Sequence, residues 1–250
     1  MQGWAASELQ QASLGDARLN QRLIKIVEDL AAQPETPVPT ACGTWAQSKA
    51  TYRFWQNKRV EAEQIIEAHL YSAVARAQVH QLVFAIQDTT DISFPHHKSK
   101  TTEQGFGLIS SQEYLLGLKV HSVFGVSPEG VPLGLLHQKV WARNPNQKGK
   151  AKQRRKRALK DKESKRWLTS LVATELGLPQ QLGVVTIADS EADIYDLLAM
   201  ERSPNSHLLI RATHNRRVDH QGQLSPSCSG SSPSSRSTGI SSAQQGQSSF

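Results

Sequence analysis

The sequence has little cysteine and no long apolar run. Cys42 and Cys228 are its two cysteines, too few for a disulfide framework or a cysteine-based metal cluster, so we expect a reducing cytoplasm as its location. No apolar stretch approaches the roughly 20 residues that cross a membrane. The first ten residues, MQGWAASELQ, have neither the basic nor the apolar part of a secretory signal. These absences argue against a membrane-spanning protein and against a disulfide-stabilised secreted one.

Acidic residues are scarce in one segment. The net charge is +7, and eleven of the 29 Lys and Arg residues fall between Lys148 and Arg166, beside only two acidic residues. The rest of the chain has a slight acidic excess. Such a run is typical of a solvated loop, but clustered cations also bind polyanions by neutralising phosphates. The second interpretation makes the densest cations candidate DNA contacts: Arg154, Arg155, Lys156 and Arg157.

Residues 1–80 have helical periodicity. Asp16 can cap a helix, and Thr44 with Gln47 has the spacing of a capping box that would open a second helix to about residue 57. The first helix has apolar residues at the spacing of one face: Leu19, Leu23, Ile26 and Leu30. The run QPETPVPT breaks the chain between them, and a third helix is expected over about 61–78.

The second predicted helix carries cations and aromatic residues but no acid. Lys49, Arg53 and Gln56 recur at i, i+4 and i+7, so they share one face. We expect its aromatic residues in the core rather than stacked on bases: Trp45, Tyr52, Phe54 and Trp55. Because residues 1–80 are charge-neutral as a whole, DNA binding by this region requires that the cationic face point outward.

Residues 81–224 have the pattern of an α/β domain with a mixed sheet. Short apolar runs predict buried strands, and a Pro-Gly turn predicts a hairpin. The expected strands are 82–86, 120–126, 131–141, 182–188 and 207–212, with helices over about 163–176 and 192–200. Residues 225–250 include twelve serines and almost nothing to bury, so we expect a disordered tail. The change is abrupt, as if the chain had lost its proper C-terminus.

Two aspartates directly follow predicted strands, Asp88 after LVFAIQ and Asp189 after VVTIA. Functional sites of open α/β sheets lie beyond the carboxyl ends of strands, where two carboxylates could share divalent cations for phosphoryl transfer. A lone aspartate at such a position is more often a turn or helix cap. Both interpretations of Asp88 and Asp189 are therefore retained. GFG at 105–107 lacks the context of a phosphate loop, and His96 and His97 suit a surface loop better than a metal site.

An ordered series of motifs resembles the DDE transposases of the insertion-sequence-four type, the group that includes the transposon-five transposase. The motifs are QDTTDISF (87–94), GLKVHSVFGVS (117–127), GLLHQ (134–138), KESKRWL (162–168), ADSEADIYDLL (188–198) and LLIRATHNRRV (208–218). Near the N-terminus, GDARLNQRLIKIVEDLAAQP and ACGTWAQSKATYRFW resemble the DNA-binding domain of that group. The resemblance covers residues 4–224, and the motifs are specific together rather than singly.

The resemblance implies a helical domain (1–80) that binds transposon ends, then a partial ribonuclease-H-like catalytic domain (81–224). Asp88 and Asp189 correspond to the first two catalytic aspartates, which would bind Mg²⁺ or Mn²⁺. Arg211 corresponds to an arginine that contacts DNA near the active site. Glu191 and Asp193 are expected to be structural partners rather than metal ligands. The expected partners are transposon ends and target DNA, with pairing of two protomers in the intact family.

The sequence departs from the family at the third carboxylate. The family places it in a Tyr-x-x-Arg-x-x-x-Glu-x-x-x-x-x-x-Lys helix well after the strand equivalent to HLLIRA, whereas here no Glu follows Glu201 and the only later acid is Asp219. The leading hypothesis is a truncated bacterial transposase whose serine-rich residues 225–250 are out of frame. One alternative is a non-catalytic DNA-binding remnant. The other is an unrelated metal-dependent nuclease, which would need a third carboxylate such as Glu191.

Overall fold

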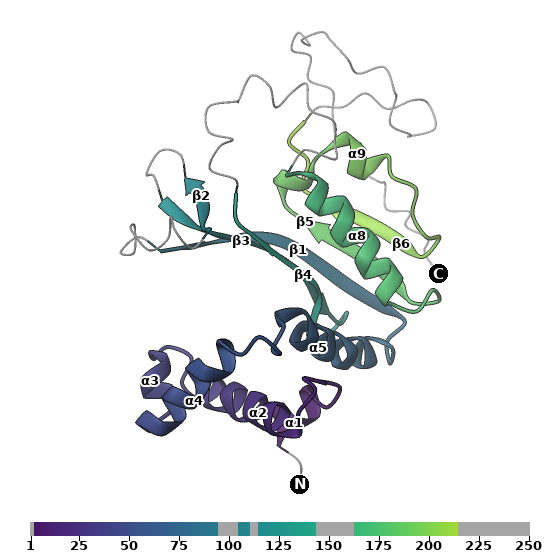
Figure 1. Cartoon of the computed structure of the whole chain (residues 1–250). Helices are drawn as coiled ribbons and strands as arrows, with labels where there is room; N and C mark the ends of the chain where they lie inside the picture. The colour runs from purple at the N-terminus through teal and green to yellow at the C-terminus, as the bar shows by residue number, and fades with distance from the viewer. Residues whose placement is uncertain (1–2, 95–104, 111–114, 144–162, 215–250) are drawn as a thin grey trace, which may run out of the picture. The chain divides into compact units, whose positions relative to one another are not determined.

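The computed structural model describes residues 3–94, 105–110, 115–143 and 163–214 (Figure 1). It divides into two compact units, and every helix and strand described here lies in the first, Met1–Thr213. Several residues singled out from the sequence lie outside the described ranges: His96, His97, Arg154, Arg155, Lys156, Arg157, Cys228 and the serine-rich residues 225–250.

The N-terminal part contains the three helices predicted from the sequence and two short ones. The helices are α1 (Trp4–Glu8), α2 (Ala17–Ala32), α3 (Val38–Ala41), α4 (Trp45–Trp55) and α5 (Ala62–Ala77). The capping predictions are confirmed, since the Asp16 carboxylate accepts from the Arg18 amide and the Thr44 hydroxyl accepts from the Gln47 amide. The expected break at QPETPVPT is partly wrong because its last residues begin the single turn α3, whose first turn tolerates proline.

Two cores meet along α5. The N-terminal half of α5 contributes Ala68 to a cluster with Leu23 and Ile26 of α2 and Phe54 of α4. Its C-terminal half contributes Ala73 and Ala77 to a different cluster, which contains strand residues. The small side chains let α5 approach the sheet closely, so this helix joins the N-terminal helices to the sheet.

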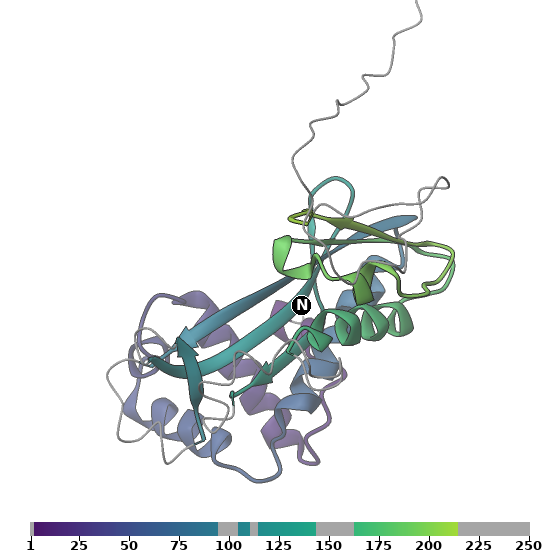
Figure 2. The ribbon, with the colours of Figure 1, turned by 90° about the horizontal axis from the view of Figure 1, so that it is seen from above.

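The predicted mixed sheet is confirmed. Its strands are β1 (Leu82–Ser93), β2 (Gly107–Ser110), β3 (Leu115–Val126), β4 (Pro132–Trp141), β5 (Gly183–Ala188) and β6 (Ser206–Ile210). The order is β2-β3-β1-β5-β6, and β4 also pairs with β3. β1 is antiparallel to β3, while β1, β5 and β6 are mutually parallel. Figure 2 shows β1 and β3 side by side along their length.

The predicted end of the first strand is wrong. β1 does not end before Asp88 but continues to Ser93, because β3 pairs with it from Phe84↔Val126 to Ser93↔Gly117. Asp88 lies opposite Ser122 in this ladder. On the other side of β1 the parallel pairing with β5 stops at Gln87↔Ala188. Asp88 is thus the first residue of β1 beyond the parallel ladder.

The helices after the hairpin differ partly from expectation. The helix α8 (Lys165–Gly177) agrees with the predicted one, whereas the predicted helix over 192–200 is replaced by the 3₁₀ turn η3 (Ser190–Ala192) and the short helix α9 (Tyr195–Leu198). Asp193 separates them: its buried carboxylate accepts bonds from the amide and hydroxyl of Thr213. That long-range contact replaces a continuous helix.

Helices α5 and α8 pack on the same face of the sheet. Val83 and Ala85 of β1 pack against α5, and Ala188 of β5 packs against Trp167 and Leu171 of α8 (Figure 1). The alternation along a strand sends neighbouring residues to the opposite face, where Ile86, Phe124 and Leu209 remain exposed. No helix in the described part of the chain is long and apolar enough to cross a membrane.

Candidate nucleic-acid interface and carboxylate pair

Helix α4 buries small polar residues and exposes large ones. Ser48, Thr51 and Phe54 recur every third residue and form its buried face. The Ser48 hydroxyl donates to the Thr44 carbonyl at 3.0 Å, so its burial leaves no unpaired group. Five large side chains of the helix are exposed, together with that of its C-terminal cap residue Gln56: Trp45, Lys49, Tyr52, Arg53, Trp55 and Gln56. The cationic face predicted from the spacing therefore points outward.

The expected burial of the aromatic residues is wrong for three of the four. Only Phe54 lies in the core, whereas Trp45 is 74% exposed, Trp55 47% and Tyr52 44%. The Lys49 ammonium lies 4.6 Å from the centre of the Trp45 ring, a cation–π arrangement. Tyr52 and Trp55 stack edge to face with ring centres 5.6 Å apart. One exposed ring is thus in contact with a cation, and the other two are in contact with each other.

This surface has the composition of a nucleic-acid contact. From Trp45 to Arg59 the sequence contains no acidic residue, and Lys49 and Arg53 are both exposed. Lys and Arg neutralise phosphates, and aromatic rings contact bases and sugars. We name the exposed residues of α4 the α4 surface: Trp45, Lys49, Tyr52, Arg53, Trp55 and Gln56.

The sheet register aligns the three residues expected beside an active site. Gln87 of β1 pairs with Ala188 of β5, and Ala188 pairs with Ile210 of β6. One step further along each strand stand Asp88, Asp189 and Arg211, and the Arg211 amide still donates to the Ala188 carbonyl. Residues at equivalent positions of parallel strands share a face. Asp88 therefore belongs to the face of the sheet opposite α5 and α8, and Asp189 and Arg211 directly follow the ends of β5 and β6.

The two aspartates differ in their partners. Asp189 Oδ1 accepts the Glu191 amide at 2.9 Å and caps η3, as the alternative interpretation expected. Asp88 lies inside a strand and caps no helix. Two hard carboxylate oxygens on adjacent strands suit a shared Mg²⁺ or Mn²⁺. Within the described residues no group of three or more His, Cys, Asp or Glu side chains is arranged to hold a metal ion.

Glu191 and Asp193 take part in structural contacts, as expected. Glu191 accepts from Arg166 Nη2 at 2.6 Å while its side chain is 63% exposed. Asp193 binds Thr213 at 2.7 Å, which ties the end of η3 to the chain after β6. These contacts hold the segment that follows Asp189.

A buried polar chain runs beneath Asp88 on the α8 face. Arg166 Nε donates to Thr89 Oγ1 at 2.9 Å, and Thr89 Oγ1 lies 2.8 Å from His121 Nδ1. His121 Nε2 lies 3.2 Å from Gln87 Oε1, and the ring packs edge-on against Trp167. Burial, with a smaller effect of the Arg166 charge, lowers the pKa of His121 to about 4. The neutral imidazole then accepts from Thr89 and donates to Gln87.

The residues of this polar chain lie in the family-like motifs, but the sequence assigns them no role. Arg166 belongs to the basic segment and to the motif KESKRWL, yet its side chain is just 11% exposed. The signal in the sequence for a buried Arg166 is its position directly before Trp167, a buried aromatic residue at the start of a helix that packs on the sheet.

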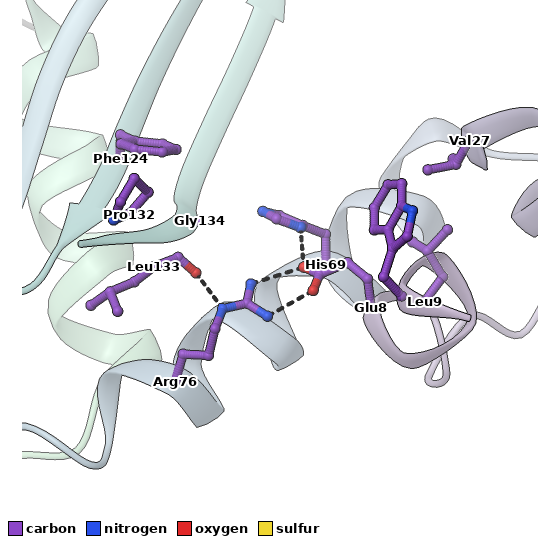
Figure 3. A pocket seen from close by; sticks show the side chains of 10 residues that line it. Glu8, Leu9, Val27, His69, Arg76, Phe124, Pro132, Leu133 and Gly134 are labelled. Atoms are coloured by element: carbon purple, nitrogen blue, oxygen red, sulfur yellow. Dashed lines mark hydrogen bonds and ion pairs between the residues drawn. The ribbon is translucent and has the colours of Figure 1, made fainter. Parts of the chain in front are cut away.

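A second ionic cluster joins the helices to the sheet (Figure 3). The Glu8 carboxylate of α1 accepts two bonds from the Arg76 guanidinium of α5 and lies 2.6 Å from His69 Nδ1. Arg76 Nε donates to the Leu133 carbonyl, and the Leu135 amide donates to His69 Nε2, both in β4. A pocket of about 420 Å³ adjoins this cluster. We name Glu8, His69 and Arg76 the junction cluster.

Arg143, which precedes the basic segment, is joined to Glu163 near the end of that segment. Arg143 donates to both carboxylate oxygens of Glu163, at 2.5 and 2.6 Å, and to the Ile109 carbonyl. Burial favours the neutral form of Glu163, but the bond and charge of Arg143 outweigh it and lower its pKa. The ion pair thus brings together the positions where residues 144–162 leave and rejoin the described structure.

Comparison with protein families identifies the N-terminal helices. Residues 1–60 match the family model described as Transposase DNA-binding. The matched range contains α1 to α4, including the α4 surface, and ends before α5. The chain therefore begins with a transposase DNA-binding domain.

Proposed function

We propose that this chain is a transposase relative of the insertion-sequence-four type that binds transposon-end DNA through α4. The observation that carries the proposal is the outward face of α4, cationic, aromatic and free of acid, within a transposase DNA-binding domain. Its partner is double-stranded DNA, with Lys49 and Arg53 on phosphates. Target DNA and a second protomer are the further partners of the intact family.

We propose that the sheet is a ribonuclease-H-like DDE domain. Its mixed sheet and the common register of Asp88, Asp189 and Arg211 support this proposal. Asp88 and Asp189 would hold Mg²⁺ or Mn²⁺, which supplies charge neutralisation and activation of an attacking oxygen in phosphodiester cleavage. Arg211 would contact the DNA backbone beside them.

The presence or absence of the family's third catalytic carboxylate distinguishes a nuclease from a protein that only binds DNA. The family motif that carries it is absent from the sequence. Glu191 is engaged by Arg166 and Asp193 by Thr213, so neither offers an obvious replacement. The proposal for these 250 residues is therefore a DNA-binding form that does not cut. A complete, unrelated metal nuclease would require Glu191 to leave Arg166, and it is the less supported alternative.

Gel-shift titration with a transposon-end duplex tests the DNA contact. We expect Lys49→Ala with Arg53→Ala to weaken binding and to lower the slope of log K against log salt concentration by about 0.9 for each phosphate that is no longer neutralised. Lys25→Ala is the matched control, since Lys25 lies on α2 in an ion pair with Asp29. If the double variant and the control bind equally well, α4 is not the contact.

The same titration tests the basic segment. Replacing Arg154, Arg155, Lys156 and Arg157 by neutral residues is expected to lower the salt slope further, because clustered cations release counterions from DNA. An unchanged slope would show that this segment does not touch the duplex.

A further inference from the structure

Arg166 donates hydrogen bonds to two residues that closely follow the aspartates, Thr89 after Asp88 and Glu191 after Asp189. Its Nε donates to the hydroxyl of Thr89, the residue after Asp88. Its Nη2 donates to the carboxylate of Glu191, two residues after Asp189. Its Nη1 donates to the Glu163 carbonyl, which fixes the guanidinium to the start of α8. A planar guanidinium can serve three such partners at once, whereas an ammonium cannot hold the same geometry.

The contacts on both sides of Arg166 are themselves fixed. Thr89 is bonded to the fully buried His121, which is held against Trp167. The Glu191 amide is bonded to Asp189 Oδ1, so a restraint on Glu191 is also a restraint on the Asp189 carboxylate. Arg166 therefore connects β1 with η3, the turn that follows β5.

Arg166 lies on the face of the sheet opposite the one that carries the Asp88 side chain. Thr89 is directed toward α8, and alternation along β1 places Asp88 on the other face. The Arg166 side chain is 11% exposed and fully engaged. It is thus placed to orient the aspartates without touching a metal ion or DNA.

We propose that Arg166 is a positioning residue that holds Asp88 and Asp189 in the relative geometry required to bind a divalent cation. The inference rests on the proposed function, in which these two aspartates form the cation site. Partners of this indirect kind typically change metal affinity 10–100-fold when they are removed.

The sign of the effect separates positioning from simple electrostatics. Removing a positive charge near a cation site should by Coulomb's law tighten cation binding. Removing a side chain that positions the ligands should weaken it instead. Arg166→Ala therefore has opposite expected results under the two explanations.

The experiment measures Mn²⁺ affinity of the full chain at pH 7 by electron paramagnetic resonance of free Mn²⁺. We expect Arg166→Ala and Thr89→Val to weaken binding about tenfold, and Asp88→Asn to abolish it. Lys165→Ala, which removes an exposed cation from the adjacent position of α8, should leave the affinity unchanged or slightly higher. Arg166→Lys, which keeps the charge but cannot form the same set of bonds, should also bind more weakly.

Thermal unfolding of each variant identifies those that fail to fold. Thr89→Val is included because valine keeps the shape of the threonine side chain while removing its hydroxyl. Arg166→Lys at wild-type affinity, or Arg166→Ala at equal or higher affinity, would overturn the positioning role while leaving the aspartate site intact. A wild-type chain without Mn²⁺ binding would overturn the aspartate site and the positioning role together.

Discussion

Three exposed aromatic side chains distinguish α4 from an ordinary amphipathic helix. Burial of a large apolar side chain contributes about 1.5–3 kcal/mol. Trp45 gives up most of this contribution, and Tyr52 and Trp55 give up part of it. Aromatic residues and arginine are also the side chains that most often dominate the energy of an interface. Their place on the same helix as Lys49 and Arg53 supports the proposal that the α4 surface binds DNA.

Trp45 and Phe54 provide a matched pair of substitutions on one helix. We expect Trp45→Ala to weaken binding to end DNA about threefold or more, because Trp45 supports the Lys49 ammonium with a cation–π contact of about 0.5–1 kcal/mol. Its thermal stability should stay close to that of the wild type, since Trp45 is mostly exposed. Gel shift and thermal melting check the two effects.

Phe54→Ala should show the reverse pattern. It is 3% exposed, and its removal should lower the free energy of unfolding by about 3–5 kcal/mol. If Trp45→Ala instead reduced stability without reducing affinity, the α4 surface would be part of a core and not a contact.

The orientation of α4 could not be derived from its sequence. Periodicity predicted the helix and its cap, and correctly grouped Lys49, Arg53 and Gln56 on one face. Hydrophobicity then chose the wrong residues for the core, because α4 buries Ser48 and Thr51. Their hydroxyls find local partners, the Thr44 carbonyl and Cys42 Sγ, so small polar residues pack where large aromatic ones were expected.

Among the elements, the strands were predicted better in position than in length. The apolar run 82–86 predicts the start of β1, but the mostly polar residues Asp88 to Ser93 extend the strand because β3 pairs with them. That pairing is a long-range property which no local pattern contains. The site residues Asp88, Asp189 and Arg211 could be selected from motifs, whereas their common register required the order of β1, β5 and β6.

The junction cluster is a long-range contact between the helices and the sheet. Its contribution to the free energy of unfolding should depend on pH. A bond from Arg76 lowers the pKa of Glu8 below its ordinary value of 4.5, against the opposing effect of burial. A lowered carboxyl pKa stabilises the fold above about pH 4.5, and that stabilisation is lost as the pH falls through the lower, folded-state pKa.

We therefore expect Glu8→Gln to lower the free energy of unfolding at pH 7 by roughly 1–2 kcal/mol, a value reduced because Arg76 is partly exposed. The difference in unfolding free energy between wild type and variant should narrow as the pH falls below about 4.5 and through the lowered pKa of Glu8. Urea unfolding at several pH values measures it. Glu67→Gln, an exposed carboxylate of α5, is the control, and a gap that stayed constant with pH would remove Glu8 from this role.

At the scale of the whole molecule, α5 makes the DNA-binding helices and the sheet parts of one compact unit, Met1–Thr213. It contributes to both cores, and the junction cluster ties α1 and α5 to β4. In the proposed function, DNA bound by α4 is bound by a unit that also contains Asp88 and Asp189.

The final prediction is that these 250 residues bind DNA but neither nick it nor join ends in Mg²⁺ or Mn²⁺. A two-metal reaction needs ligands for both ions, and the described residues supply a pair of carboxylates without a third group gathered around it. Glu191, the nearest candidate in sequence, is bonded to Arg166.

Supercoiled plasmid carrying a transposon end, incubated with either metal, should remain uncut while gel shift detects the complex. The double variant Asp88→Ala, Asp189→Ala should bind that DNA as well as the wild type does, because the α4 surface is unchanged. Nicking by the wild type that disappears in the double variant would contradict the prediction and would identify Glu191, released from Arg166, as the residue to replace next.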